Sequence, residues 1–243
     1  MPTDAEFGND DDKRRRAISA YFALCSMVDD HVGAICAALE GAGLAETTTV
    51  IYTSYHGEAL GQRDHWAKSN LYNECTQVPL IVAGPDVPRG RICSTPVNLI
   101  DLAPTFLAGF GLSDPQLRGR SLFDVAREPF DPNRTTFSEY HAVGAPSGGF
   151  MLRKERWKYH EYVGFEPELF DLQSDPDEAI NLAGDPACAA RVAKLRDELR
   201  RIVDPEFADR QAKADQRALV ERFGGRETAF RIGTEGATPA PSA

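Results

Sequence analysis

Residues 47–84 decide the fold of this chain, and they read TTTVIYTSYHGEALGQRDHWAKSNLYNECTQVPLIVAG. The stretch opens with 47–54 and closes near 78–83, two unbroken runs rich in apolar and β-branched residues. Such runs are typical of buried strands in a parallel sheet. A polar segment of roughly twenty residues separates them, and loops of that length are commonly functional. We therefore expect an α/β fold whose active face lies in this segment.

Helices are predicted on both sides of the two strands. Apolar positions recur at threes and fours from Arg16 to Leu39, which predicts a long amphipathic helix closed by Gly41 and Gly43. Residues 98–110 predict a shorter helix. The chain up to about residue 130 is therefore expected to form a layered α/β body.

The pattern changes after about residue 130. Four short, alternating segments follow, separated by turn residues: 135–140, 149–154, 157–163 and 168–172. They predict a small antiparallel sheet, and the apolar face of 186–203 predicts a helix packed on it.

These changes divide the chain into four parts. Residues 1–16 are a polar tail, and 17–130 form the α/β body. Residues 131–204 form the antiparallel subdomain, and 205–243 are a helical extension that ends in a disordered Pro/Ala/Gly tail.

Composition excludes several classes of protein. Of 243 residues, 42% are hydrophobic and 26% are charged, the balance of a soluble globular protein. A net charge of −10 disfavours nucleic acid as a partner. We expect no membrane contact, since no run approaches the roughly 20 uninterrupted apolar residues that span a bilayer.

The cysteines and the first residues bear on the compartment. The five cysteines are odd in number and form no CxxC pair, which disfavours a disulfide framework and a zinc site. Residues 1–16 lack the apolar centre of a secretion signal. We therefore expect a cytoplasmic chain.

The loop after the first strand concentrates polar side chains. Within thirteen residues it carries two histidines, two acids and two cations: His56, Glu58, Arg63, Asp64, His65 and Lys68. Such a set is suited to a metal site or an anion site, and it is equally compatible with a solvated loop. Composition alone leaves both readings open.

The sequence from Thr53 to Pro85 resembles the second half of the sulfatase family, which reads T-S-D-H-G-x-x-L-G, then W-x-K, then V-P-L-I. Further segments resemble the family in the same order, namely 21–33, 99–105, 157–159 and 168–182. The resemblance runs from about residue 17 to 204. It implies part of a three-layer, alkaline-phosphatase-like α/β fold, followed by a small antiparallel subdomain with a helix.

The resemblance also assigns roles in the loop. Sulfatases hydrolyse sulfate esters with a formylglycine, while calcium holds the sulfate oxygens. Lys68 matches the family lysine that hydrogen-bonds sulfate, and His56 matches a metal-binding position. His65 is a second sulfate-binding candidate, or it caps the loop. Tyr55 stands at the position of a ligand aspartate, and a neutral phenol is a poor ligand for calcium.

The nucleophile of the family is absent from this sequence. No Cys/Ser-x-Pro/Ala-x-Arg motif occurs, and the nearest approach, Ser94 to Asn98, ends in the wrong residue. The pair Asp29–Asp30 lies in a predicted helix and is read as solvated. The resemblance therefore implies a truncated chain that binds calcium weakly or not at all and is inactive alone.

Three functions stay open at this point. The chain is part of a sulfatase that acts on a small-molecule sulfate ester once completed, or a phosphate or phosphonate ester hydrolase of the same superfamily, or a non-catalytic remnant that binds an anion or a partner. An incomplete sheet exposes apolar surface, which predicts association with an N-terminal half or with a second copy. His31, His141 and His160 are read as structural or surface residues, and the aromatics of 157–162 as core.

Overall fold

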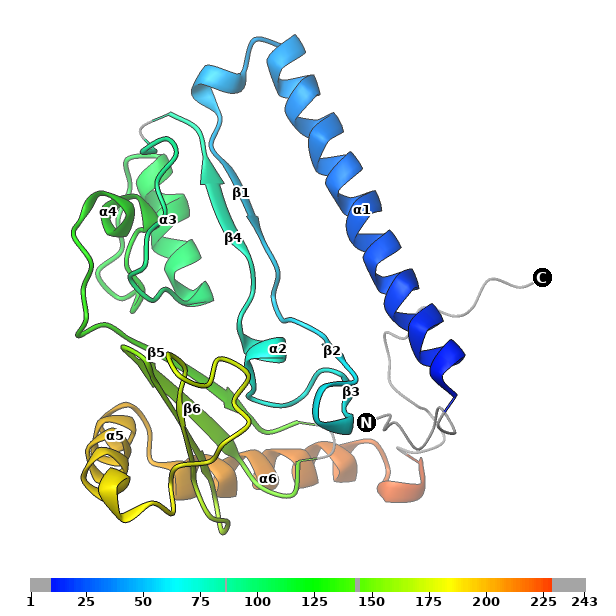
Figure 1. The fold of residues 1–243 in the computed structure, drawn as a ribbon, viewed down its shortest axis with the longest axis vertical. Coiled ribbons are helices and arrows are strands. Elements are labelled where there is room, and N and C mark those ends of the chain that lie inside the picture. The colour runs from blue at the N-terminus through cyan, green and yellow to red at the C-terminus, as the bar shows by residue number, and fades with distance from the viewer. Residues whose placement is uncertain (1–9, 86, 143–144, 229–243) are drawn as a thin grey trace.

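A computed structural model describes residues 10–85, 87–142 and 145–228. Figure 1 shows the long helix α1 (Asp11–Gly41) on one side and the strands β1 (Val50–Thr53) and β4 (Leu80–Ala83) beside it. A second sheet with its helices forms the base of the molecule. The chain thus has an N-terminal body and a C-terminal subdomain.

Helix α1 begins at Asp11, earlier than the apolar pattern predicts. The cause is an N-cap, because the backbone amides of Asp12 and Lys13 donate to Oδ1 of Asp10 at 3.0 and 3.1 Å. No residue of α1 is buried. Several of its large apolar side chains are exposed: Phe22, Leu24, Met27, Val28 and Ile35. By length and composition α1 could cross a membrane, but soluble core helices and signal sequences pass the same test.

Strands β1 and β4 form a two-stranded antiparallel sheet in which Val50 lies opposite Ala83. The prediction of a parallel pair was therefore wrong. An apolar run indicates burial and not strand direction, and here the intervening segment folds back so that the chain returns beside itself. All four residues of β1 are half-buried, which leaves this sheet less covered than the sequence predicted.

The segment between β1 and β4 folds into small elements. Strands β2 (Ala59–Leu60) and β3 (Trp66–Ala67) pair antiparallel across the 3-10 turn η3 (Gln62–Asp64). The one-turn helix α2 (Asn73–Thr76) follows and leads into β4. The predicted loop is thus a folded unit, and its elements decide where its polar side chains lie.

The helix predicted at 98–110 is confirmed as the 3-10 turn η4 (Leu99–Asp101) followed by α3 (Leu102–Gly109). Asn98 and Asp101 form a capping box at its start. Asp101 is fully buried and accepts hydrogen bonds from Arg134 Nη2 at 2.7 and 2.6 Å. A short 3-10 turn, η2 (Ala45–Thr47), precedes β1, and the helix α4 (Leu122–Arg127) packs near α3.

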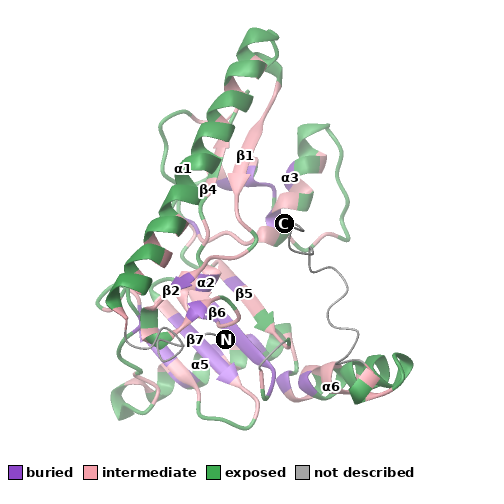
Figure 2. Ribbon diagram, turned by 90° about the vertical axis from the view of Figure 1, so that its right-hand side faces the viewer, coloured by how far each residue is buried: buried purple, intermediate pink, exposed green. Residues whose placement is uncertain are grey.

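The predicted antiparallel sheet is confirmed. Its four strands run in sequence order: β5 (Thr135–Tyr140), β6 (Gly149–Lys154), β7 (Trp157–Tyr162) and β8 (Glu168–Asp171). Helix α5 (Ala189–Ile202), entered through the 3-10 turn η5 (Pro186–Cys188), packs on one face. The core between them consists of Phe150, Leu152, Tyr159, Leu169, Val192, Leu195 and Leu199. Figure 2 shows this sheet as the most buried part of the molecule.

Helix α6 (Pro205–Arg222) is the predicted C-terminal extension. Asp204 caps its start by accepting from the backbone amide of Phe207 at 2.9 Å, and Asp209 accepts from the backbone amide of Gly148 at 2.7 Å. The helix is therefore fixed to the sheet. The predicted disordered tail, and residues 1–9 of the polar N-terminal tail, lie outside the described residues.

Candidate functional site

The turn that follows β1 lies tightly against α2. The backbone amide of Gly57 donates to the carbonyl of Cys75 at 2.8 Å. A Cβ atom on Gly57 would lie 2.1 Å from the carbonyl oxygen of Glu74, closer than any side chain allows. Glycine is therefore required here, and it fixes the two residues that precede it.

Those two residues are Tyr55 and His56, and their rings meet edge to face at 4.0 Å between centroids. Nδ1 of His56 lies 2.7 Å from the carbonyl oxygen of Gly57, so this nitrogen carries the proton and donates. Nε2 of His56 is buried and has no partner among the described residues. It presents an unused lone pair. Tyr55, by contrast, is 80% exposed.

Lys68 lies on a loop with unusual backbone geometry. Four non-glycine residues here have positive φ angles: Arg63 at 52°, Asp64 at 57°, Ala67 at 69° and Ser69 at 91°. Such conformations are unfavourable by about 1–3 kcal/mol each and persist only where surrounding contacts enforce them. They tend to cluster at functional sites, and two of them, Ala67 and Ser69, flank Lys68.

The contacts that enforce this loop come from the neighbouring helix α2 and from the C-terminal subdomain. Arg63 forms an ion pair with Glu74 and donates to the carbonyl of Asp177. The backbone amide of Asn73 donates to Oε2 of Glu178 at 2.6 Å. Oε1 of Glu178 lies 2.7 Å from Nζ of Lys158, and both side chains are buried. Hydrogen bonds to Asp177 and Glu178 thus hold this segment on the C-terminal subdomain, and the Lys158–Glu178 ion pair fixes Glu178.

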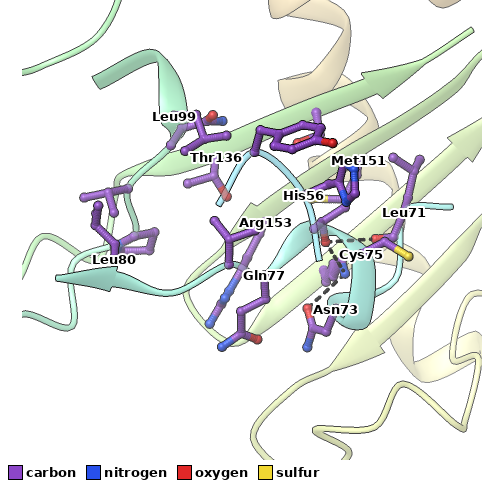
Figure 3. A pocket seen from close by; sticks show the side chains of 18 of the residues that line it. His56, Leu71, Asn73, Cys75, Gln77, Leu80, Leu99, Thr136, Met151 and Arg153 are labelled. Carbon is purple, nitrogen blue, oxygen red and sulfur yellow. Dashed lines mark hydrogen bonds between the residues drawn. The ribbon is translucent and has the colours of Figure 1, made fainter. Parts of the chain in front are cut away.

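Three of the predicted site residues, Tyr55, His56 and Lys68, line one cavity of about 610 Å³. Figure 3 shows His56 at one end of this cavity and Leu80 and Leu99 at the other. Arg153 and Lys158 also line it, and neither was a candidate in the sequence. The only signal for Lys158 was its place in a segment that resembles the family, and for Arg153 there was none.

His65, the fourth predicted residue, lines a different cavity of about 550 Å³. Four residues line both cavities: Ser69, Asn70, Leu71 and Tyr140. The positive φ angles of Ala67 and Ser69 break the regular alternation of side chains, so neighbours on this loop face different spaces. The structure therefore does not place His65 in the cavity that Lys68 lines.

The residues near His56 do not fit calcium, the cation implied by the resemblance. Calcium takes 6–8 oxygen ligands, and His56 offers a nitrogen while Tyr55 offers an exposed phenol. Within the described ranges, no group of three or more His, Cys, Asp or Glu side chains could hold a metal. The metal-binding expectation for His56 thus rests on this single unused nitrogen.

The aromatic residues predicted to be core and the histidines predicted to be structural lie in different environments. Tyr159 is fully buried in the core, as predicted, whereas Tyr162 lines the second cavity. His160 is buried beside Glu168, with 2.9 Å between Nδ1 and Oε2, and His31 is exposed. All five cysteines lie in the described residues and are free.

Two family models match the chain. The Sulfatase model matches residues 2–112, and the model "N-sulphoglucosamine sulphohydrolase, C-terminal" matches residues 61–204. Arylsulfatase K of Xenopus laevis is 35% identical over 197 residues, which cover 76% of this chain and 36% of the relative. Arylsulfatase K of Homo sapiens is 36% identical over 175 residues, which cover 67% of this chain and 33% of the relative.

Solved structures agree with these matches. A 2-O GAG sulfatase aligns with a TM-score of 0.71 at 28% identity, covering 86% of this chain and 46% of that protein. A phosphonate monoester hydrolase from Silicibacter pomeroyi aligns with a TM-score of 0.64 at 32% identity, covering 72% of this chain and 38% of that protein.

The chain spans about a third of the length of the curated relatives it matches. Its fold is part of the alkaline-phosphatase-like fold of the sulfatases, as the sequence predicted. The chain belongs to the sulfatase family.

Proposed function

We propose that this chain supplies the sulfate-recognition side of a sulfatase active site, with a small-molecule sulfate ester as substrate. The observation that carries the proposal is the setting of Lys68. Lys68 is an exposed residue that lines the first cavity, and among the residues described its side chain makes no hydrogen bond or ion pair. An unpaired cation on a cavity wall is suited to a tetrahedral anion.

The rigid loop supports this role. A lysine side chain is flexible, and ordering it around an anion costs conformational entropy. The strained backbone on both sides of Lys68, and the hydrogen bonds of Arg63 and Asn73 to the C-terminal subdomain, hold the loop in place in advance. His56 lines the same cavity, and its Nε2, which is buried and has no partner among the described residues, is the nitrogen that we assign to accept a proton or a hydrogen bond from the bound ester.

We further propose that these residues do not turn over the ester by themselves. Sulfate ester hydrolysis in this family needs an oriented nucleophile, and residues 1–243 contain no Cys/Ser-x-Pro/Ala-x-Arg motif. Positioning of the ester without a nucleophile leaves most of the barrier in place. Because the donor set around His56 is a poor match, calcium binding to this chain is expected to be weak.

A phosphonate ester is the second candidate substrate. One of the similar solved structures is a phosphonate monoester hydrolase at 32% identity. Sulfate and phosphonate monoesters share a tetrahedral anionic centre, so Lys68 alone does not discriminate between them. The choice must come from other residues around the cavity.

The exposed apolar side chains of α1 and α3 point to a partner. Phe106 and Ile100 near α3 are more than half exposed, as is Phe22 on α1. We propose that a polypeptide carrying the remaining part of the sulfatase fold covers them, since exposed apolar side chains favour association. Sedimentation at micromolar concentration should show self-association of the chain alone. A compact monomer would count against the proposal.

Anion titration tests the main proposal. Inorganic sulfate and methylphosphonate are titrated calorimetrically into the chain, its Lys68→Ala variant, and a Lys194→Ala control on the exposed face of α5. Sulfate should bind, with affinity reduced about tenfold in Lys68→Ala and unchanged in the control. Equal binding by all three proteins would refute the proposal. Preference for methylphosphonate would favour the second candidate.

A further inference from the structure

The second cavity, which His65 lines, has walls rich in phenyl and phenol rings. Four of the described residues that line it carry one: Tyr72, Tyr140, Tyr162 and Phe165. Phe165 is 61% exposed, so this wall reaches the molecular surface. A volume of about 550 Å³ is in the range of sites that enclose a whole small molecule. The face of an aromatic ring carries negative potential and attracts a cation.

The charge of the lining has the same preference. The described residues that line this cavity include two glutamates, Glu166 and Glu168, but neither lysine nor arginine. In the described part of the chain Glu168 forms an ion pair only with His160, with 2.9 Å between Oε2 and Nδ1. Burial lowers the pKa of His160, so its ring is neutral at pH 7 and supplies no positive charge. The wall therefore carries a carboxylate without a counter-ion.

The carboxylate of Glu168 is ionised, and its lone pairs are largely occupied. The hydroxyl of Tyr72 donates to Oε1 at 2.7 Å, and the hydroxyl of Tyr162 donates to Oε2 at 3.3 Å. Nδ1 of His160 donates to Oε2 as well. Burial alone would raise the pKa of Glu168, but the hydrogen bonds from His160 and Tyr72 outweigh it and hold the pKa below its ordinary value. The negative charge is thus available to a ligand, whereas few acceptor positions are.

This shortage of acceptors selects between kinds of cation. A primary ammonium group has three N–H donors, and each needs an acceptor in place of the water that it loses. Glu168 already accepts three hydrogen bonds, and aromatic faces are weak acceptors. A fully methylated ammonium has no N–H donor, so the charge and the apolar faces of the rings satisfy it.

We propose that the second cavity binds a small methylated ammonium ion between Glu168 and the aromatic walls. Glu168 supplies the charge, and Tyr162 and Phe165 supply contact surface. The ligand is a molecule separate from the ester, and the proposal does not depend on the role of Lys68. A dissolved methylated amine and the trimethylammonium headgroup of a lipid share this chemistry, and the volume of the cavity favours the dissolved ion.

Ligand-observed NMR at pH 7 tests the kind of ligand on the wild-type chain. Tetramethylammonium is compared with methylammonium, which has the same charge but three N–H donors, and with tert-butanol, which is similar in size but neutral. Tetramethylammonium should bind about tenfold more tightly than either of the other two. The proposal is overturned if tetramethylammonium does not bind, or if tert-butanol or methylammonium binds equally well.

Two variants locate the bound ion. Glu168→Gln removes the charge and should weaken tetramethylammonium binding about tenfold. Phe165→Leu removes a ring but keeps an apolar side chain, and it should weaken binding about threefold. Phe207→Leu, at an exposed phenylalanine on α6 outside the lining, is the matched control and should have no effect. Because Phe165 is exposed, its variant remains informative even where Glu168→Gln fails to fold, and unchanged binding by Phe165→Leu would refute the site.

Phosphatidylcholine vesicles distinguish the two sources of the ion. We expect the chain not to sediment with them through this cavity, whereas sedimentation that tetramethylammonium reverses would identify the lipid headgroup as the source of the same cation. Lys68→Ala should bind tetramethylammonium as the wild type does. Loss of sulfate binding and loss of cation binding therefore report separately on the proposed function and on this site.

Discussion

Nζ of Lys158 lies 2.7 Å from Oε1 of Glu178, and the two side chains are 1% and 0% exposed. Lys158 also donates to Oδ1 of Asn73 at 3.0 Å and to Oγ1 of Thr76 at 3.3 Å. Burial lowers the pKa of Lys158 to about 8, while Glu178 favours its charged form. This pair joins strand β7 to the segment that presents Lys68, and so couples the subdomain to the site.

Removal of one partner of this pair should destabilise the protein strongly. Glu178→Gln leaves a buried ammonium without its counter-charge, for which we expect a loss of about 3–5 kcal/mol in the free energy of unfolding. Urea unfolding measures the loss. The control is Arg120→Gln, which breaks the exposed Arg120–Glu128 pair and should cost about 1 kcal/mol or less. Equal losses in the two variants would contradict the structural role of the buried pair.

Stability should fall as the pH drops below about 6.5, in part through His160. Burial lowers the pKa of His160, and its Nε2 has no partner among the described residues, so folding favours the neutral ring. Below the ordinary histidine pKa the unfolded chain takes up a proton that the folded chain does not, which shifts the equilibrium toward unfolding.

The measurement compares unfolding free energies at pH 7 and pH 5 for the wild type and for His160→Gln. Glutamine keeps a donor toward Glu168 but does not titrate. The wild type should therefore lose more stability between the two pH values than the variant. Identical pH dependence in both proteins would show that His160 does not titrate differently on folding.

Tyr55→Asp should increase the affinity of the chain for calcium. The substitution adds a carboxylate beside His56 at an 80% exposed position, where the change of side chain should not disturb the fold. Tyr55→Phe is the control for loss of the hydroxyl alone. Calcium titration calorimetry should show tighter binding only in Tyr55→Asp. Tight binding already in the wild type would contradict the poor donor match at this turn.

Sequence patterns predicted the strands and the helix of the C-terminal subdomain. They did not predict the strand direction or the helix start in the N-terminal body. Alternation along β5 to β8 and the apolar face of α5 depend on local periodicity, and both elements formed as expected. The direction of β4 against β1 is not a local property, because it depends on how the intervening residues fold back. The start of α1 was missed because Asp10 caps it through its side chain.

The candidate residues of the site came from a motif that resembles the family. Tyr55, His56 and Lys68 do line one cavity. The anchoring of their loop by Lys158 and Glu178 joins residues far apart in the chain, and no spacing rule connects them. The separation of His65 into the second cavity depends on the backbone turns around it, which sequence patterns do not specify.

One measurement tests the central claim that this chain recognises a sulfate ester but lacks the means to cleave it. 4-Nitrophenyl sulfate is titrated into the wild type and into Lys68→Ala while bound ligand and released 4-nitrophenolate are followed in the same samples. We expect saturable binding that weakens about tenfold in Lys68→Ala, with no release of 4-nitrophenolate by either protein. Binding that is indifferent to Lys68, or release by the wild type above the Lys68→Ala level, would contradict it.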